Sequence, residues 1–409
     1  MINQADTVWM LIATAMVMIM TPTLAFFYGG LVRKKNILSV LMQCMVMLCI
    51  ISVQWVLFGY SLAFGPDKNG LIGGLEWLGL NNVGLIPNND YFNTIPHLLF
   101  MGFQMMFAVI TPALMIGAFV ERIKFKGFLV FSVLWATLIY DPLAHWIWAK
   151  GGWLCQMGAL DFAGGTVIHL SAGVAALVFI LLMGKRSGNN ANRSPHNLPF
   201  AVLGTGFLWF GWFGFNAGSA GAANSVAVAA FINTNTAAAA GGLLWMILDW
   251  KMNQVPTMLG LATGIVAGLA AVTPGAGYVT PLSALLIGCM SSIICFFFVS
   301  RIKKYFGYDD ALDVFGVHGI AGILGTLAVG LFATKTVNPG GADGLFYGNA
   351  HQLAIQSLMV AVAIVFVAIG TTIIYKLVDI LIGMRVGNDD EYIGLDLTQH
   401  HEAGYTLVD

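Results

Sequence analysis

Long apolar runs dominate this chain, and short polar connections separate them. A helix that crosses the hydrocarbon core of a membrane needs about 20 consecutive apolar residues. The first run is not expected to be a signal peptide, because its leader MINQAD has no positive charge and the run is too long for a signal's apolar core. The pattern predicts eleven transmembrane helices, at about 8–31, 37–64, 95–120, 127–149, 164–184, 198–218, 224–249, 256–274, 279–300, 314–334 and 351–383.

The composition agrees with this pattern. Of the 409 residues 58% are hydrophobic and 9% are charged, which is far outside the range of soluble domains. We therefore expect an all-α integral membrane protein. A net charge of −1 without a basic face gives no indication of a nucleic-acid partner. The five cysteines show no paired spacing, so we expect neither a disulfide framework nor a metal site, and we expect no cofactor.

The positive charges indicate how the helices are oriented. Of the 18 Lys and Arg, all but Lys68, Lys150 and Lys335 fall in one set of alternate connections or at the end of the last run. Positively charged loops stay in the cytoplasm. The N-terminus is therefore expected outside and the C-terminus inside, which agrees with an odd number of spans.

Two histidines stand at matching places in two of the apolar runs. The chain reads DFAGGTVIHLSAG around His169 and DDALDVFGVHGIAG around His318. In both segments an Asp precedes the His by eight residues, and an Ala-Gly pair follows three and four residues later. Titratable groups inside a membrane are costly and usually face an interior path. The two segments therefore suggest one site that is built twice.

The places of the two histidines predict an inverted repeat. They fall on the fifth and tenth predicted spans, so each half has five spans and the halves run in opposite directions. Such halves meet near the middle of the membrane, where the substrate path lies. We expect repeats at about 8–184 and 198–334, with 351–383 packing across them. Together residues 1–383 form a transport domain, followed by a cytoplasmic tail, 384–409. Small residues from Ala237 to Gly242 predict close helix contact.

The histidine pair suits a small N–H solute or a proton. A neutral imidazole has one donor and one acceptor, so two abutting rings can share one hydrogen bond and offer a polar strip in a dry pore. The alternative is a buried histidine that bonds to a backbone carbonyl. For one histidine that alternative is favoured, but the repeated spacing favours the pore.

Aromatic residues mark the expected entrance. Phe103 and Phe107 lie one helical turn apart, Trp148 ends the fourth span, and Phe215 and Ser219 are four residues apart in GWFGFNAGSAG. Aromatic faces attract small cations by about 1–2 kcal/mol when partly desolvated, and a Ser hydroxyl can accept an N–H bond. The alternative for each aromatic is packing against lipid or in the interfacial belt.

Acidic residues are scarce in the spans. Asp161 precedes the fifth span, and we expect its carboxylate to cap the helix N-terminus. The alternative is a negative charge that favours a cation in the outer vestibule. Asp310 and Asp313 are expected to cap the matching helix on the cytoplasmic side.

The motifs together resemble one known family. DFAGGTVIH, GWFGFNAGSAG, DVFGVHGIAG, FYGGLVRKKN and the tail segment GLDLTQHHEAGY are similar to motifs of the ammonium transporter (Amt/Mep/Rh) family, in particular its bacterial Amt branch. The resemblance implies a homotrimer with one pore in each subunit. It implies a recruitment site of Phe103, Phe107, Trp148 and Ser219, a gate of Phe107 and Phe215, the twin histidines His169 and His318, an essential Asp161, and path-lining residues Phe27, Tyr28 and Trp212.

The function implied is ammonium transport at the plasma membrane, with methylammonium as an analogue. Ammonium would be recruited at the aromatic site and deprotonated, and ammonia would pass the histidines, with electrogenic proton transfer. The tail would contact a PII-type regulator, although composition alone is equally compatible with disorder. His401 stands where the family motif usually has Gly, so a C-cap with positive φ is expected to be lost.

Other classes fit less well. A potassium channel would need carbonyl-lined loops or acidic rings, which we do not find. A membrane enzyme that used the histidines with a metal would need further ligands at metal spacing, so no enzyme is predicted. The serious alternative is an ammonium sensor of the same family. A sensor would be expected to carry a long signalling domain, which residues 384–409 are too short to form.

Overall fold

The structure of the protein is a computed structural model that describes residues 1–187 and 194–405. Arg193, which belongs to the basic connections, and tail residues 406–409 lie outside these ranges. In the described residues, ten helices are long and apolar enough to cross a membrane. The remaining predicted span, 256–274, contains α11 (Met258–Val272), whose 15 residues extend about 22 Å at 1.5 Å per residue. The predicted all-α membrane fold is confirmed, with α11 shorter than expected.

The first half of the chain forms the first five predicted spans and a small surface hairpin. Strand β1 (Asp67–Lys68) pairs antiparallel with β2 (Ile72–Gly73) in the connection after the second span. Short helices in the connections are η1 (Lys34–Asn36), η3 (Leu78–Leu80) and α7 (Trp153–Gln156). The larger helices are α1 (Gln4–Leu31), α2 (Ile37–Gln54), α3 (Tyr60–Phe64), α4 (His97–Phe119), α5 (Phe125–Trp135), α6 (Asp141–Trp148) and α8 (Ser171–Met183).

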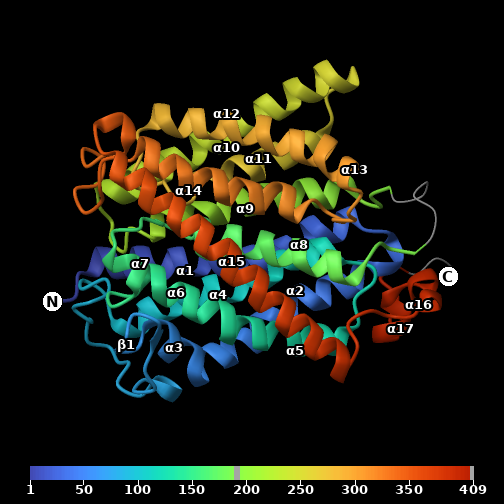
Figure 1. The fold of residues 1–409 in the computed structure, drawn as a ribbon, viewed down its shortest axis with the longest axis horizontal. Helices are drawn as coiled ribbons and strands as arrows, with labels where there is room; N and C mark the ends of the chain where they lie inside the picture. The colour runs from blue at the N-terminus through green and yellow to red at the C-terminus, as the bar shows by residue number, and fades with distance from the viewer. Residues whose placement is uncertain (188–193, 406–409) are drawn as a thin grey trace.

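The second half continues the bundle and ends in the tail. Beyond α11 its helices are α9 (Leu198–Gly218), α10 (Ser225–Asn253), α12 (Pro281–Phe297), α13 (Lys303–Phe306), α14 (Ile320–Phe332), η9 (Leu345–Tyr347), α15 (Ala350–Leu381), α16 (Asn388–Ile393) and α17 (Leu395–His400). As predicted, α15 runs diagonally across the bundle, where it contacts α14, α8 and α5 (Figure 1).

In the part of the chain that the structure describes, five spans contain a π-helical turn, in which one extra residue is accommodated. Such turns are rare and are frequent at functional sites. The hydrophobic pattern gave no sign of them. They are η2 (Trp55–Gly59), η4 (Ala136–Tyr140), η5 (Gly165–Leu170), η7 (Phe298–Ile302) and η8 (Phe315–Gly319). Two of them, η5 and η8, carry the histidines singled out from the sequence.

Small residues let the helices approach closely. A Cβ atom on Gly241 of α10 would lie 2.5 Å from the carbonyl oxygen of Gly264 in α11, and one on Gly204 of α9 would lie 2.6 Å from the backbone nitrogen of Phe27 in α1. Neither position has room for a side chain. The predicted close contact at 237–242 is therefore confirmed.

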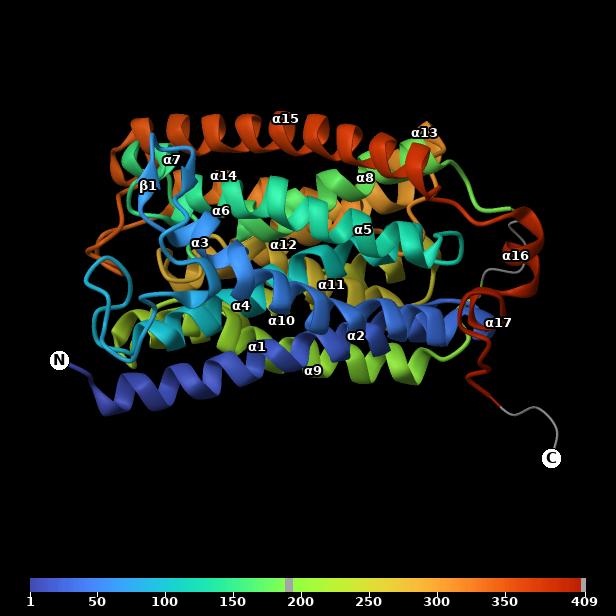
Figure 2. The same cartoon turned by 90° about the horizontal axis from the view of Figure 1, so that it is seen from below.

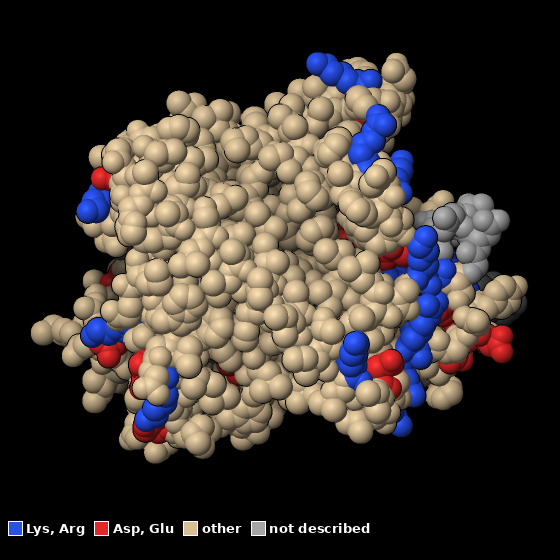
Figure 3. Space-filling view, in the orientation of Figure 1, with Lys and Arg blue, Asp and Glu red and all other residues tan. Residues whose placement is uncertain are grey.

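Basic side chains gather at one end of the bundle. Figure 3 shows most of the visible Lys and Arg at the end where the C-terminal tail lies, and the two termini lie at opposite ends in Figure 1. We call the end with the tail the basic end. The asymmetry is the one that the loop charges predicted.

The described part of the tail is ordered. Helices α16 and α17 cover the basic end beside α2, as Figure 2 shows. Asp396 accepts a hydrogen bond from the backbone N–H of Ser39 at 2.8 Å, and Leu395 N–H donates to Asn36 at 2.8 Å. His401 has φ 55 and its N–H donates to Leu397 O. The expected loss of the positive-φ cap is therefore wrong, because His401 adopts that conformation itself.

Candidate functional site

The two histidines meet in the centre of the bundle. The rings of His169 and His318 lie side by side with nearly parallel planes, their centroids 5.3 Å apart and the planes inclined by 16°. Both residues are buried, at 1% and 4% exposure. Among the described residues, neither ring nitrogen of His169 has a hydrogen-bond partner. Nδ1 of His318 has none either. The hydrogen bond expected between the two rings is therefore absent. These nitrogens do not bond to a backbone carbonyl either, which is the alternative interpretation of a buried histidine.

Glycines bring the two histidine segments together in a reciprocal way. A Cβ atom on Gly173, four residues after His169, would lie 2.2 Å from the Cα atom of Gly319. A Cβ atom on Gly322, four residues after His318, would lie 2.6 Å from the backbone nitrogen of Leu170. Each glycine thus contacts the residue that follows the other histidine. The repeated Ala-Gly pair in the sequence is therefore what allows the two segments to cross.

Aspartates hold the N-terminal ends of these segments. The carboxylate of Asp161 accepts four backbone N–H bonds of 2.7–3.0 Å, from Gly164, Gly165, Thr166 and Val167. Gly164 has φ 110, a conformation that favours glycine and turns these amides toward the carboxylate. Burial raises the pKa of Asp161, and the four N–H bonds oppose that rise. The predicted capping role is confirmed.

The matching segment uses one aspartate in the same way. Asp310 accepts from the N–H groups of Val314 and Phe315 at 3.0 and 2.8 Å. Asp313 does not cap as expected. Its carboxylate instead accepts from Lys303 Nζ at 2.6 Å, although Asp313 directly precedes the helix, where it has φ 61.

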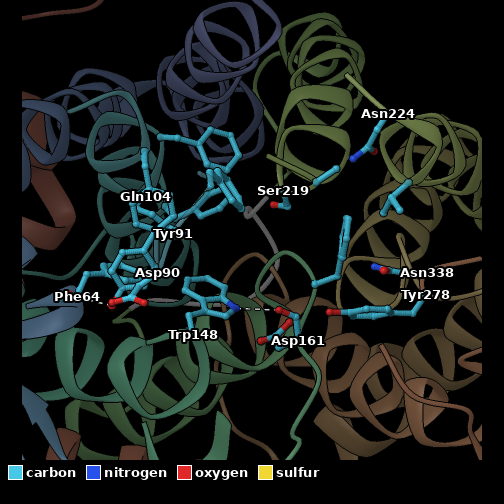
Figure 4. Close-up of a pocket in the computed structure, with 17 residues that line it drawn as sticks. Phe64, Asp90, Tyr91, Gln104, Trp148, Asp161, Ser219, Asn224, Tyr278 and Asn338 are labelled. Carbon is cyan, nitrogen blue, oxygen red and sulfur yellow. Dashed lines mark hydrogen bonds between the residues drawn. The ribbon is translucent and has the colours of Figure 1, made fainter. Parts of the chain in front are cut away.

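A vestibule opens above the histidines, at the end opposite the basic end. It has a volume of about 380 Å³ and is lined by Phe103, Phe107, Trp148, Ser219 and Asp161, which the sequence predicted to lie together. Figure 4 shows Ser219 across the opening from Trp148 and Asp161. Trp148 Nε1 donates to the backbone oxygen of Asp161 at 2.8 Å, and Ser219 Oγ donates to Phe215 O at 2.8 Å. The Ser219 lone pairs are therefore left to accept a bond.

Two phenylalanines separate the vestibule from the histidines. Phe107 and Phe215 have centroids 4.5 Å apart, with planes inclined by 51°, so they are tilted against each other rather than parallel. Phe107 lines the vestibule, whereas Phe215 lines the cavity of the histidines. Both are buried, at 1% and 0% exposure. They form a closed aromatic barrier in this structure.

The central cavity is narrow and apolar. Only about 10 Å³ of it is open to the centre of a water-sized molecule, which is about enough for one. Trp212 stacks on His169 at 5.3 Å, and its indole N–H bonds to Thr273, so that it presents no donor to the cavity. Besides aliphatic side chains, the lining consists of His169, His318, Trp212, Phe215 and Phe27.

A second vestibule leads from this cavity toward the basic end. It has a volume of about 200 Å³, and Phe27 and His318 line both spaces. Tyr28 lines it as well, with its hydroxyl bonded to Leu114 O at 2.9 Å. The three spaces form a line through the bundle, and every site residue predicted from the sequence lines one of them.

Sequence reasoning missed several polar residues of the outer vestibule. Gln104, Asp90, Asn224, Tyr278 and Asn338 also line it, and Figure 4 shows them around the opening. Gln104 could have been found, because it is a polar residue beside Phe103 in an apolar span. The others lie in or near connections, where polar residues are common and give no signal. In the described residues no three His, Cys, Asp or Glu side chains form a group that could hold a metal ion.

Comparison with known proteins gives matches over nearly the entire chain. The sequence profile described as Ammonium Transporter Family matches residues 8–405. The chain is 54% identical to a protein named ammonium transporter from Bacillus subtilis, over 98% of this chain and 99% of that protein. It is 44% identical to Ammonium transporter Amt1 of Archaeoglobus fulgidus, over 99% and 100%.

Solved structures show the same fold. The crystal structure of Candida albicans Mep2 superposes with a TM-score of 0.90 at 35% identity, over 99% of this chain and 94% of that chain. A structure titled Sensor Amt Protein superposes with a TM-score of 0.88 at 32% identity, over 97% of this chain and 98% of that chain.

Proposed function

Since the chain belongs to the ammonium transporter family, we propose that it recruits ammonium in the outer vestibule, removes a proton and conducts ammonia past His169 and His318. Membership makes it a multi-pass protein of the plasma membrane, in a family that transports ammonium, and not an enzyme. The steps within the pore are the proposal. The observation that carries it is the pair of buried imidazoles, in which both nitrogens of His169 and Nδ1 of His318 have no partner among the described residues.

Recruitment takes place where aromatic faces and an acceptor meet. Phe103, Phe107 and Trp148 offer π faces to a small cation, worth about 1–2 kcal/mol when partly desolvated. Ser219 accepts an N–H bond, because its own proton is used on Phe215 O. An ammonium ion satisfies both kinds of contact. Potassium has no N–H to donate, so it gains the cation–π attraction without the hydrogen bond.

Ammonium is deprotonated in the vestibule because moving an ion into the central cavity would cost too much free energy. Beyond Phe107 and Phe215 the cavity is buried and apolar, and moving an ion there without a charged partner costs many kcal/mol. A neutral ammonia molecule avoids this cost. It is about the size of water, which the cavity accommodates one at a time.

The histidine nitrogens then replace part of the lost hydration. Ammonia can donate an N–H to an unprotonated ring nitrogen and accept from a protonated one. Each buried polar atom without a partner costs about 1–3 kcal/mol, and a passing solute relieves that cost. The released proton crosses by a separate step that involves the histidine pair and the Asp161 region, which makes transport electrogenic.

The proposal extends to assembly and partners. By resemblance to the family, the subunit forms a homotrimer with one pore in each copy, with the N-terminus outside and the C-terminus in the cytoplasm. The transport domain, 1–383, contains the two inverted repeats, and tail 384–409 is regulatory. The ordered tail on the basic end supports a docking surface there for a PII-type regulator. Methylammonium is the expected transported analogue.

A sensor with little or no transport is the second candidate. It is favoured by the 32% identity to the protein titled Sensor Amt Protein, since a sensor can keep the same pore residues. The two functions differ in flux. A sensor needs to bind ammonium but does not need to pass it.

The test is a measurement of current and internal pH in proteoliposomes. An ammonium pulse and, separately, a potassium pulse are given to the wild type and to the double variant His169→Ala, His318→Ala. We expect an ammonium-specific current that the double variant loses or that loses its selectivity. A wild-type response equal to that of empty liposomes would support the sensor and overturn the transport mechanism.

A further inference from the structure

Asp141 is a carboxyl group in the middle of a membrane-spanning segment, and the substrate path does not use it. It is the first residue of α6, lies within the segment Phe125–Gln156 and is 0% exposed. None of the three spaces along the path is lined by Asp141. Ionisable side chains at such places are rare, and proton-carrying sites are among their known roles.

The hydrogen bonds of Asp141 leave one oxygen without a partner. Its Oδ2 accepts from Gln54 Nε2 at 2.8 Å, while Oδ1 has no partner among the described residues. The amide oxygen of Gln54 is likewise buried without a partner. A buried carboxylate that has one uncharged donor is far less stable than the carboxylic acid. The geometry therefore favours a proton on this group.

The backbone of two spans is shaped around this pair. The π-helical turn η2 begins directly after Gln54, and η4 ends directly before Asp141. A Cβ atom on Gly59, at the end of η2, would lie 2.6 Å from both side-chain amide atoms of Gln54. The histidines of the path lie in turns of the same kind, η5 and η8. The Gln54–Asp141 pair thus shares a local structure with the site already described.

One helical turn from Asp141, His145 holds a further proton. It is 0% exposed, with Nδ1 2.8 Å from Ala63 O and Nε2 2.8 Å from Asp67 Oδ1. A carbonyl and a carboxylate only accept, so an imidazole bonded to both must donate from both nitrogens or leave the proton on Asp67. In either case the Asp67–His145 pair stores one proton more than a neutral histidine beside an ionised aspartate.

This pair reaches the surface. The Asp67 side chain is 33% exposed and belongs to strand β1, at the vestibule end of the bundle. Asp141 and His145 are four residues apart on α6, so they share a face and lie about 6 Å apart at Cβ. A line of polar groups therefore leads from solvent into the membrane beside the substrate path.

We propose that Asp67, His145 and Asp141 form a row of proton-binding groups, separate from the ammonium path, that loads Asp141 with a proton from the solution at the vestibule end. A proton taken up by Asp67 passes over 2.8 Å to His145 Nε2. His145 then gives its Nδ1 proton to Asp141 Oδ1, once that nitrogen has left Ala63 O. This transfer leaves the remaining proton of His145 on Nε2, so the imidazole ring must turn over and return an N–H to Ala63 O before Nε2 can accept another proton from Asp67.

On the neighbouring elements, no other charged group is placed to carry a proton from solvent to Asp141. Lys68 of β1 pairs with Glu76 at 2.7 Å, and Tyr60 of α3 bonds to His97 at 2.6 Å. The remaining titratable groups on elements that contact α6 are Tyr140 in η4, Cys155 in α7 and His169 in η5. The row lets the pH of the adjoining solution set the charge of Asp141 inside the membrane, on the same helix that ends in Trp148.

Infrared spectroscopy of the full-length protein in liposomes tests the row without a transport assay. A buried protonated carboxyl gives a separate carbonyl stretch, which shifts when its proton exchanges with D2O. We expect this band at neutral pH in the wild type and its loss in Asp141→Asn. The control Asp249→Asn, at the far end of α10, should keep the band. If the spectra of the wild type and Asp141→Asn were the same, the proposal would be overturned.

Access to the buried acid is tested by variants that should fold normally. An Asn at position 67 still accepts from His145 Nε2 but cannot take up a proton. Asp67→Asn should therefore keep the Asp141 band and slow its exchange with D2O by about tenfold or more, whereas the exposed-site control Glu76→Gln should not. Equal exchange rates in Asp67→Asn and wild type would show that protons do not enter through Asp67, and would overturn the row.

Discussion

The rings of His169 and His318 stack at a centroid distance of 5.3 Å without sharing a hydrogen bond. A stacked pair of imidazoles with open nitrogens does little for the stability of the bundle, since buried polar atoms without partners are costly. The arrangement makes sense when another molecule supplies the missing bonds. Stability and transport are therefore expected to respond in opposite directions to changes at this pair.

Replacing His169 by Leu should separate the two properties. Leu has a similar size and no polar atom, so thermal stability in detergent should stay level or rise. Uptake of labelled methylammonium should fall by about tenfold or more, equal to a barrier increase of at least about 1.4 kcal/mol. A variant that unfolds readily and transports normally would contradict this account of the pair.

The helix cap formed by Asp161 should contribute more to the free energy of unfolding than the cap formed by Asp310. Asp161→Asn keeps one acceptor oxygen, so two of the four N–H groups lose their acceptor and face the new NH2 group instead. The free energy of unfolding should fall by about 2 kcal/mol or more. Asp310→Asn, the matched variant in the other half, removes the acceptor of only one N–H group and should cost less. Chemical denaturation in detergent gives both values. A larger loss at Asp310 would be the contrary result.

Adding a methyl group at the crossing of the two histidine segments should be disruptive. Gly173→Ala places a Cβ 2.2 Å from Gly319 Cα, and such overpacking costs about 1–3 kcal/mol. Gly206→Ala is the control, because nothing lies within 4 Å of a Cβ there and alanine favours the helix. Melting temperatures should fall for the first and hold or rise for the second. Equal melting temperatures would show that the crossing can widen freely.

The basic end should make the fold sensitive to acid. Glu121 bonds to Arg33 and Arg186, and Asp309 bonds to Arg186. Burial by itself would raise the pKa of both carboxyls, but the hydrogen bonds and charges of the arginines lower them overall. The unfolded chain then binds protons more readily. These groups stabilise the fold above their unfolded pKa values of about 4, and the contribution is lost as the pH falls further.

The measurement is the melting temperature in detergent as a function of pH. Wild type should lose stability between about pH 4 and pH 2.5. Asp309→Asn should be less stable at neutral pH and should show a smaller loss over that range. A variant curve parallel to the wild-type curve would mean that Asp309 does not contribute through its charge.

Asp310 should have the opposite effect on the pH dependence of stability, because its pKa is raised in the folded protein. Burial raises its pKa to about 6, against the opposing charge of Lys303. The folded protein then binds the proton more readily than the unfolded chain, so this group disfavours the fold above about pH 6 and the penalty is relieved as the pH falls toward 4. Asp310→Asn should flatten that part of the stability curve. An unchanged slope between pH 6 and 4 would refute this assignment.

His401 offers a test of the tail. It holds φ 55 at the end of α17, a conformation that costs a non-glycine residue about 1 kcal/mol. His401→Gly should therefore strengthen α17, seen as slower hydrogen exchange of its amides. Faster exchange would mean that contacts of the imidazole outweigh the backbone strain.

The sequence by itself determined which parts cross the membrane and which residues face the path. Apolar length is a local property, and a repeated His in an apolar run has few uses, so the spans, the His169 and His318 pair and the cap of Asp161 could all be predicted. Aromatics such as Phe107 and Phe215 could be placed because family motifs fix their order. Each of these inferences depends on residues close together in the chain.

The tertiary structure decided how those residues meet. The hydrogen bond expected between the histidine rings is absent, and the crossing of Gly173 with Gly319 fixes how closely the two histidine segments approach. Asp313 pairs with Lys303 instead of capping, and His401 keeps a glycine-like conformation. The π-helical turns, the pair of Asp141 and Gln54, and the polar rim of the vestibule apart from Gln104 had no local signal. They result from contacts between segments far apart in the chain, and a pattern along one segment does not encode such contacts.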